Sequence, residues 1–580
     1  MLTRALLATL PLLLASESVA SQSFATSSPK LPADSHRVLR GAQSAQAAFE
    51  NHRRANLPLN TGGTSGRCDV RVGRLCYWWD EGEWTGPPES SKIKAARARL
   101  LERLASAASW LPGDAWIVGQ RVRYLVEDGR PAEAEGVARD CQAAAHWCAA
   151  LLGYSLHAAA RFAEADSAFG AALAAMAEPE RCRWTDITPL LEDRAKKHYE
   201  KLECAQRAAF EARFWALSRP LYLLPANDLR TEHFARLTMI EMLRTSRYPH
   251  PMTWGDDMGE LLLRYGWETR WSREAPSMSS GASIHVVGHE PTPAFDFVPD
   301  PDVLTAPDSA DGSDWMLRDR MAQSRYAPSY ARSVTDLGPQ VALFRRGDSA
   351  LVVAAFDLSR DTAFKRDSIS AALAISPAAA PESAVVIGDD SARRRDALTA
   401  TAAWQPLLVS VEGRDSAERR VARTRFVARP PSATGGRVTV SDLLLFDHPA
   451  SLPVSIDDAL PRARGSLRVE RNTPVGVYWE MYGLQEAGAT VAYTLTVTRV
   501  SVPWLRRAAE RLKVVDRRAP VRMKWDEPSG RPDGVRSRAL AVDFSTLPTG
   551  QYRVDLTVEA DGQPPVVASR VVEVIEGRSR

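Results

Sequence analysis

The chain has 580 residues, a formal net charge of +3 and six cysteines, and 45% of its residues are hydrophobic. These fractions are typical of globular proteins and exclude wholesale disorder. The near balance of 74 basic and 71 acidic residues argues against a dedicated nucleic-acid binder. At roughly 150 residues per domain, the length indicates about four units.

The first segment, residues 1–20, predicts a secretory signal peptide. Arg4 supplies a positive start, and the apolar run Ala5–Leu14 is too short to cross a bilayer of about 30 Å. Ser18 and Ala20 are the small residues of a cleavage site, so we expect cleavage after Ala20. Because no later stretch is long and apolar enough for a transmembrane anchor, we expect a secreted or periplasmic protein.

Two segments precede the helical pattern. Residues 21–66 are rich in Ser, Ala, Thr and Gly with weak periodicity, and this predicts a flexible linker. Residues 67–89 contain Cys68 and Cys76, and Gly73 between them can make the turn that brings the sulfurs together. The aromatic residues that follow predict a small core pinned by the bridge, and stacking of a ligand on the tryptophans is the alternative. They are Tyr77, Trp78, Trp79 and Trp84.

The cysteines are expected to form disulfides, which an extracytoplasmic location permits. Six cysteines allow fifteen pairings, and the sequential pairing needs the shortest loops. It joins Cys68 to Cys76, Cys141 to Cys148, and Cys182 to Cys204. A zinc site is disfavoured, because the chain lacks a C-x-x-C pair and suitably spaced histidines.

Residues 90–247 predict a domain of helical hairpins. The stretch Gly129–Ala134 is echoed by Ala160–Ala165, Gly153 gives a small residue where two helices touch, and Phe169 lies at the spacing of a packed second helix. This resembles the tetratricopeptide repeat, whose period is about 34 residues. We expect two to four hairpins with a concave groove for a protein or peptide partner, and an ordinary helical bundle is the alternative.

The remaining chain changes to a β pattern after a proline-rich junction at residues 248–330. Within the junction, Glu260–Gly266 and Ser283–Val287 are predicted strands. A first β domain is expected at 331–430 and a second at 437–580, each a sandwich with turns between its strands. The expected strands are 341–346 and 350–356 as a hairpin across Gly347-Asp348, then 384–387, 407–412, 424–428, 438–446, 465–470, 475–482, 490–499, 539–544, 552–560 and 566–574, with a short helix or loop at 506–513. The predicted fold class is therefore α+β multidomain, with helical hairpins followed by antiparallel β-sandwiches.

Three stretches together resemble the GWxTD-domain family of secreted bacterial proteins. The first is Thr253–Gly266, in which Trp254, Asp257, Gly259, Arg264, Tyr265 and Gly266 match the family signature, whereas Thr253 and Asp256 replace its Gly and Thr. The second is Val440–Phe446, which resembles the family's Ser-Asp-Leu strand, and the third is Val475–Leu484, which resembles its Tyr-x-Glu-x-Tyr strand. The resemblance covers roughly residues 249–560 and implies no established activity.

The third stretch supplies candidate binding residues. On a strand Tyr478, Glu480 and Tyr482 share one face, whereas Trp479 and Met481 share the other, which is the expected core face. The Tyr-Glu-Tyr face is expected to point outward, where it would pair across strands or form a polar contact surface. With the signature residues, the candidate binding set is Trp254, Asp257, Tyr265, Tyr478, Glu480 and Tyr482.

Motifs for catalysis are absent from the sequence, which contains neither G-x-S-x-G nor H-E-x-x-H. His285, His289 and Glu290 suggest a metal pair or a hydrolase site only superficially, because the i, i+4 spacing needs a helix and the stretch reads as a strand. An acidic loop is a second possible metal site, for calcium, but the spacing of its carboxylates does not follow the EF-hand pattern. It contains Asp296, Asp300, Asp302, Asp308, Asp311 and Asp314. We predict no catalytic residue, metal or cofactor.

The function that this organisation favours is a non-enzymatic extracytoplasmic scaffold that binds a protein or peptide through the helical groove. The first alternative is a module that binds carbohydrate or cell-envelope glycan through exposed tryptophans. The chain has sixteen tryptophans in total. A secreted hydrolase with a site assembled from distant residues is the second alternative.

Overall fold

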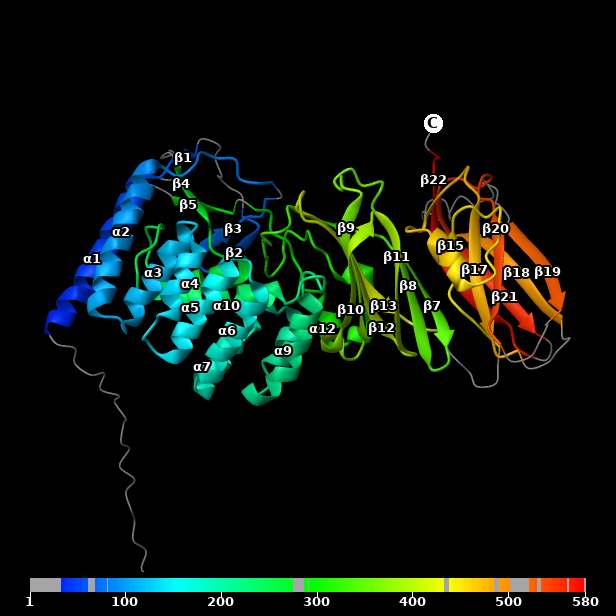
Figure 1. Cartoon of the computed structure of the whole chain (residues 1–580), viewed down its shortest axis with the longest axis horizontal. Coiled ribbons are helices and arrows are strands. Elements are labelled where there is room, and N and C mark those ends of the chain that lie inside the picture. Colours follow the sequence, from blue (N-terminus) through cyan, green and yellow to red (C-terminus); the bar gives the residue numbers. More distant parts are fainter. Residues whose placement is uncertain are drawn as a thin grey trace, which may run out of the picture.

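The computed structural model describes residues 33–60, 68–80, 82–274, 286–290, 292–431, 438–484, 490–500, 521–528, 534–560 and 563–577. A helical block, a first β-sandwich and a second β-sandwich follow one another along the longest axis of the molecule (Figure 1). The predicted α+β multidomain class is confirmed. The expected signal peptide and the helix or loop at 506–513 lie outside the described residues.

The helical block forms where apolar residues recur at three and four positions, as predicted for residues 90–247. Its helices are α1 (Ala33–Asn56), α2 (Ser91–Trp110), α3 (Ala115–Glu127), α4 (Pro131–Arg139), α5 (Ala145–Ala158), α6 (Phe162–Ala175), α7 (Glu178–Thr185), α8 (Asp193–Tyr199), α9 (Cys204–Ser218), α10 (Asp228–Arg244) and α11 (Asp256–Tyr265). None of the helices in the described residues carries an apolar stretch of the length that a bilayer requires.

The repeated units are the hairpins α3–α4 and α5–α6. A Cβ atom on Gly153 would lie 2.7 Å from Cε1 of Phe169, so only glycine allows α5 and α6 to approach this closely. Ala165, Phe169 and Ala172 are fully buried on the facing side of α6, as their spacing predicts. Pro131 occupies the first turn of α4, where a missing N–H costs nothing.

Helix α10 packs against α3, α5 and α6. The Nε2 of Gln120 on α3 donates to the carbonyl of Met242 at 2.8 Å, and His157 on α5 lies 2.9 Å from Thr231 Oγ1. Much of α10 is buried as a result. The surface of α3, α5 and α6 that contacts α10 is therefore covered within the chain, and the partner groove stays a prediction.

The predicted linker over residues 21–66 is wrong in its middle part, where Ala33–Asn56 forms α1 against α2. The buried stripe of α1 includes Gln46, Glu50 and Arg53 beside Phe49. Charged and amide side chains at these positions hide the helical period from a search for apolar residues. Alanine, arginine and glutamine nevertheless favour helix, which the composition argument overlooked.

The junction also differs from prediction, because Asp256–Tyr265 is helix α11 and not a strand. Met258, Leu262 and Tyr265 are buried at helical spacing, and Gly266 at φ +90° ends the helix. Strand β5 (Val286–His289) confirms the second predicted strand in part, since residues 283–285 lie outside the described residues. The other elements of this region are β1 (Leu59–Asn60), β2 (Val70–Val72), β3 (Leu75–Tyr77), β4 (Arg270–Glu274) and α12 (Pro301–Thr305).

The first sandwich consists of the sheet β10-β9-β12-β13-β6 and the sheet β11-β8-β7. Its predicted hairpin is confirmed, with Gly347 at φ +64° in the turn. The predictions did not include β6, β9 or β11. The strands are β6 (Ser333–Asp336), β7 (Gln340–Arg346), β8 (Ser349–Asp357), β9 (Ser368–Pro377), β10 (Val385–Arg393), β11 (Arg395–Ala403), β12 (Leu407–Asp415) and β13 (Arg420–Ala428).

The second sandwich packs the sheet β14-β17-β15, to which β20 adds beside β17, on the sheet β16-β22-β21-β18-β19. The predicted strand at 438–446 is split into two short strands, and β19 was not predicted. The elements are β14 (Thr439–Val440), β15 (Leu444–Phe446), α13 (Ile456–Ala459), β16 (Arg468–Glu470), β17 (Val475–Tyr482), β18 (Thr490–Arg499), β19 (Val521–Pro528), β20 (Arg536–Val542), β21 (Gly550–Ala560) and β22 (Val566–Ile575).

Two of the hydrophobic cores cross the boundaries between units. One joins α8 and α9 to β12 and β13, with Phe214 and Val421 among its members. The other joins β7 and β8 to β15 and β17, with Phe344 and Tyr478 in contact at a ring distance of 5.9 Å. Apolar burial therefore holds neighbouring units to each other as well as stabilising each unit.

Candidate functional site

The structure contains three disulfides in the sequential pairing that the sequence predicted. Cys68 and Cys76 close the β2–β3 hairpin, where Gly73 turns the chain at φ +52°. Cys141 and Cys148 link the end of the first helical hairpin to the start of the second. The bridges therefore lie where the sequence placed them, between neighbouring repeats and in the small hairpin.

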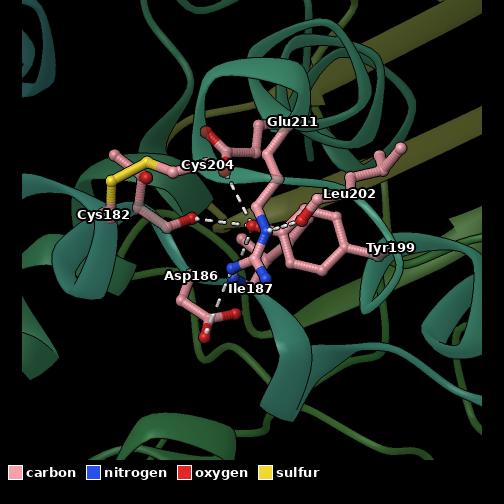
Figure 2. The surroundings of a disulfide bond; sticks show 9 residues. Cys182, Asp186, Ile187, Tyr199, Leu202, Cys204 and Glu211 are labelled. Atoms are coloured by element: carbon pink, nitrogen blue, oxygen red, sulfur yellow. Dashed lines mark hydrogen bonds and ion pairs between the residues drawn. A yellow bond between two sulfur atoms is a disulfide. The ribbon is translucent and has the colours of Figure 1, made fainter. Parts of the chain in front are cut away.

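The third bridge, Cys182–Cys204, joins α7 to α9 beside a compact cluster around Tyr199 (Figure 2). The Tyr199 hydroxyl donates to Glu211 Oε1 at 2.7 Å, and the Arg207 guanidinium lies 4.6 Å from the centre of the tyrosine ring. Burial raises the pKa of both Tyr199 and Glu211. These contacts enclose the tyrosine on several sides, which gives the cluster a structural role.

The GWxTD-like stretch places its candidate residues against the disulfide hairpin. Asp257 receives Arg74 through two bonds of 2.7 Å, from Nε and Nη2, and Arg74 holds the pKa of Asp257 far below its usual range. Tyr265 stacks on Tyr77 with ring centres 3.9 Å apart. A Cβ atom on Gly73 would lie 2.6 Å from that of Asp257, so the turn glycine also permits this contact.

Trp254 and the end of α11 complete the same junction. Trp254 lies edge-on to Tyr248 at 5.5 Å and packs on the helical core. Arg236 on α10 donates to the carbonyls of Leu263 at 3.0 Å and Arg264 at 3.1 Å, and so caps the carboxyl end of α11. It also donates to the Arg325 carbonyl at 2.7 Å. The three candidates Trp254, Asp257 and Tyr265 therefore join α11 to its surroundings, and their role in binding stays a prediction.

The Tyr-Glu-Tyr residues do not point outward as expected, because Tyr478, Glu480 and Tyr482 are 0%, 1% and 9% exposed. Glu480 accepts both tyrosine hydroxyls, at 3.0 and 2.7 Å, and receives two bonds from Arg346 on β7, at 2.6 and 3.0 Å. Burial raises the pKa of both tyrosines, so they remain donors at neutral pH. We call these four residues the Glu480 cluster.

The Glu480 cluster is buried because the first sandwich covers it. The backbone N–H of Arg345 donates to the Tyr482 hydroxyl at 2.9 Å, from the other sandwich. Trp479 and Met481 are buried on the opposite face, as predicted. An outward polar face was a reasonable expectation for one sandwich alone, and it is wrong because a second unit packs against it.

The Ser-Asp-Leu stretch joins the same two sandwiches. Asp442 Oδ2 accepts from the Leu343 N–H on β7 at 2.9 Å, and the Asp442 N–H donates to the Leu343 carbonyl at 3.2 Å. Gln340 donates to the carbonyls of Leu445 and Arg464, at 3.0 and 2.8 Å. This pairing across the boundary splits the predicted strand 438–446.

A further set of junction residues was missed by the sequence analysis. Arg425 on β13 donates to the Leu217 carbonyl at 2.7 Å and so caps the end of α9. Arg423 donates to the Pro220 carbonyl, just after this helix, at 2.8 Å. Glu412 accepts from the Leu223 N–H at 2.9 Å. The sequence carries one signal for these residues. Arg423 and Arg425 lie two positions apart and so share one face of the strand, and this face is buried.

The hydrolase alternative concerns His289 and Glu290, since His285 lies outside the described residues. His289 Nε2 lies 2.7 Å from Ser272 Oγ, but Ser272 is 0% exposed and the Trp84 ring stacks on the histidine at 4.6 Å. Burial lowers the pKa of His289 and raises that of Glu290 to about 8. Because Ser272 is fully buried, a substrate has no access to it in the structure. The contact between Ser272 and His289 therefore joins β4 to β5.

The acidic loop uses its carboxylates in local structure. Asp300 caps α12 at 2.9 Å from the Asp302 N–H, Asp302 pairs with Arg194 at 2.8 Å, and Asp311 and Asp314 cap the same short turn. Over the described residues, no group of three or more His, Cys, Asp or Glu has the arrangement of a metal site.

Comparison with known proteins gives little further guidance. No family model matches the chain, and no curated protein matches it. Among solved structures, red sea bream transglutaminase is 12% identical with a TM-score of 0.14, and the match covers 42% of this chain and 32% of that one. The FN1–FN3 domains of chicken CNTN1 are 12% identical with a TM-score of 0.15, and the match covers 44% of this chain and 70% of that one. Likenesses this weak bear on neither fold nor function.

Proposed function

We propose that this chain is a non-enzymatic extracytoplasmic scaffold that holds its helical block and two sandwiches in a fixed order for a protein or peptide partner. The observation that carries the proposal is the use made of the candidate residues. Asp257, Tyr265, Tyr478, Glu480 and Tyr482 all make contacts between elements of different segments. Because these residues fix the arrangement of the segments, they support a role in which the arrangement itself presents the binding surface.

The partner in this proposal binds the hairpins α3–α4 and α5–α6 on a surface that α10 leaves uncovered, since α10 contacts α3, α5 and α6. The extracytoplasmic location rests on the sequence of residues 1–20 and agrees with three disulfides, which are rare in reducing compartments. Membership of the GWxTD-domain family is part of the same proposal and rests on the three sequence stretches.

The glycan-binding alternative has less support. A sheet that binds glycan would present a row of surface tryptophans. Among the tryptophans in the described residues, Trp110 is the strongly exposed one, with 74% of its surface accessible, and it lies at the end of helix α2. Trp79, Trp271 and Trp479 are all buried in packed interiors.

Cross-linking in the native cell envelope tests the proposal. We expect the mature protein to be cross-linked to one protein or peptide partner in a stoichiometric amount, with cross-links to more than one unit of the chain. Glu480→Ala is expected to loosen the pairing of the sandwiches and reduce the joint cross-links, whereas Glu559→Ala on the exposed face of β21 leaves them unchanged. Retention on insoluble glycan without any protein cross-link would contradict the scaffold and favour the alternative.

A further inference from the structure

A cavity of about 660 Å³ lies between the two sandwiches, on the boundary that the Glu480 cluster also spans. The first sandwich contributes Arg360 and Arg395, and the second contributes Asp447, Arg464 and Arg468. Gly465 forms part of the wall, where a Cβ atom would lie 2.1 Å from the backbone of Phe356. Pockets that bind small organic molecules have volumes of about 300–1,000 Å³.

Each of the four arginines in the cavity wall pairs with a carboxylate. Arg360 pairs with Glu470 at 2.7 Å, and Arg468 pairs with Glu573 on β22 at 2.9 Å. Asp357 is a further carboxylate of the wall. Asp447 is shared, because it pairs with both Arg395 and Arg464. One carboxylate therefore serves two guanidinium groups, and each guanidinium has more donors than this arrangement uses.

The arginines differ in how far they are committed to the fold. Arg464 is 10% exposed at its side chain, and its Nε atom has no hydrogen-bond partner among the described residues. Arg395 and Arg360 are 43% and 48% exposed, so both can turn toward a ligand without unfolding the wall. The remaining wall includes the apolar residues Pro449 and Pro474.

We propose that this cavity binds a small organic anion, whose carboxylate or phosphate takes the place of Asp447 on Arg395 and Arg464. Planar guanidinium groups bind both oxyanions through paired hydrogen bonds, and the proline wall receives the body of the ligand. The site goes beyond the proposed scaffold, because a scaffold needs no small ligand. Binding between the two sandwiches also stabilises their contact.

Isothermal titration of the mature chain with glucuronate, citrate and inorganic phosphate tests the proposal, with glucose as the neutral probe and sodium chloride matching the ionic strength. We expect saturable binding of at least one organic anion and none of glucose. Arg395→Gln and Arg360→Gln are each expected to weaken binding about tenfold, the loss of one charged hydrogen-bonding group. Arg553→Gln, an equally exposed arginine paired with Asp555 on β21, is expected to leave binding unchanged.

Asp447→Asn and Asp357→Asn, which each remove one carboxylate from the wall, together separate this site from general attraction of anions. If the ligand replaces the carboxylate of Asp447 on Arg395 and Arg464, Asp447→Asn raises the affinity more than Asp357→Asn does, and an equal rise would contradict the replacement. Inorganic phosphate binding without either organic acid would restrict the ligand to a free oxyanion and overturn the organic class. Absence of binding by every probe, or equal binding by Arg395→Gln and the unchanged chain, would overturn the site itself.

Discussion

The helical and the β parts of this chain are held together by different means. The helical part carries all three disulfides, and each closes a short stretch of chain between Cys68 and Cys204. The two sandwiches have no cysteine and are joined by an apolar core and by buried polar groups around Glu480, which is 1% exposed. Covalent links constrain the unfolded chain, whereas a buried charge must find all its partners in the folded state. The β junction therefore depends on non-covalent contacts alone, whereas the helical part adds three bridges to its own buried ion pairs of Glu50 with Arg53 and Arg123.

Glu480→Ala should give the largest effect. It removes the carboxylate that accepts from the Tyr482 hydroxyl and the Arg346 guanidinium, whereas the Tyr478 hydroxyl keeps Ser537 Oγ at 2.8 Å. Breaking a buried, hydrogen-bonded charge group costs about 3–5 kcal/mol. Urea unfolding measures this loss, and Glu559→Ala on the exposed side of β21 is the matched control. Equal stability of the two variants would contradict the role given to the Glu480 cluster.

Removing the Cys182–Cys204 bridge tests the helical side of the comparison. The bridge spans 22 positions, and a loop of this size contributes about 3 kcal/mol to the free energy of unfolding. The double substitution Cys182→Ser and Cys204→Ser should lower the thermal midpoint by more than the same change at Cys141 and Cys148, which are 7 positions apart. A reversed order would show that loop length does not govern these bridges.

A pH series tests the buried carboxylate of Asp228, at the contact of the helical block with the segment before the first sandwich. Burial raises the pKa of Asp228 to about 6, although Tyr330 donates to it at 2.9 Å. The folded state therefore holds the proton more tightly, and its stability falls as pH rises from about 4 to about 6, by about 2–3 kcal/mol. Asp228→Asn should remove this part of the slope. An unchanged slope would place the titration elsewhere.

The smallest effect is expected from Asp257→Asn. Its partner Arg74 is 54% exposed at the side chain, so water screens the pair despite its two short bonds. We expect a thermal midpoint close to that of the unchanged chain. A nuclear magnetic resonance titration should show the lowered pKa of Asp257 in the unchanged chain and lack this titration in the variant. A loss comparable to that of Glu480→Ala would remove the distinction between the exposed and the buried junction.

The sequence predicted those elements whose own pattern carries the information. The hairpin across Gly347 and the strand 475–482 follow from alternation and turn residues, and the cysteine pairing follows from short loops. Helix α1 was missed because Gln46, Glu50 and Arg53 interrupt its apolar stripe. The burial of Glu480 was also missed, because one strand's pattern cannot show that a second sandwich covers its polar face. Contacts between units are made by residues far apart in the chain, such as Arg346 and Glu480, and local pattern does not link them.

Small-angle X-ray scattering of the intact chain tests the central claim that the units form one fixed arrangement. The account predicts a profile that a single extended conformation fits, and a broader profile for Glu480→Ala, in which the sandwiches separate at their boundary. A profile of the unchanged chain that only a mixture of domain orientations can fit would contradict the account.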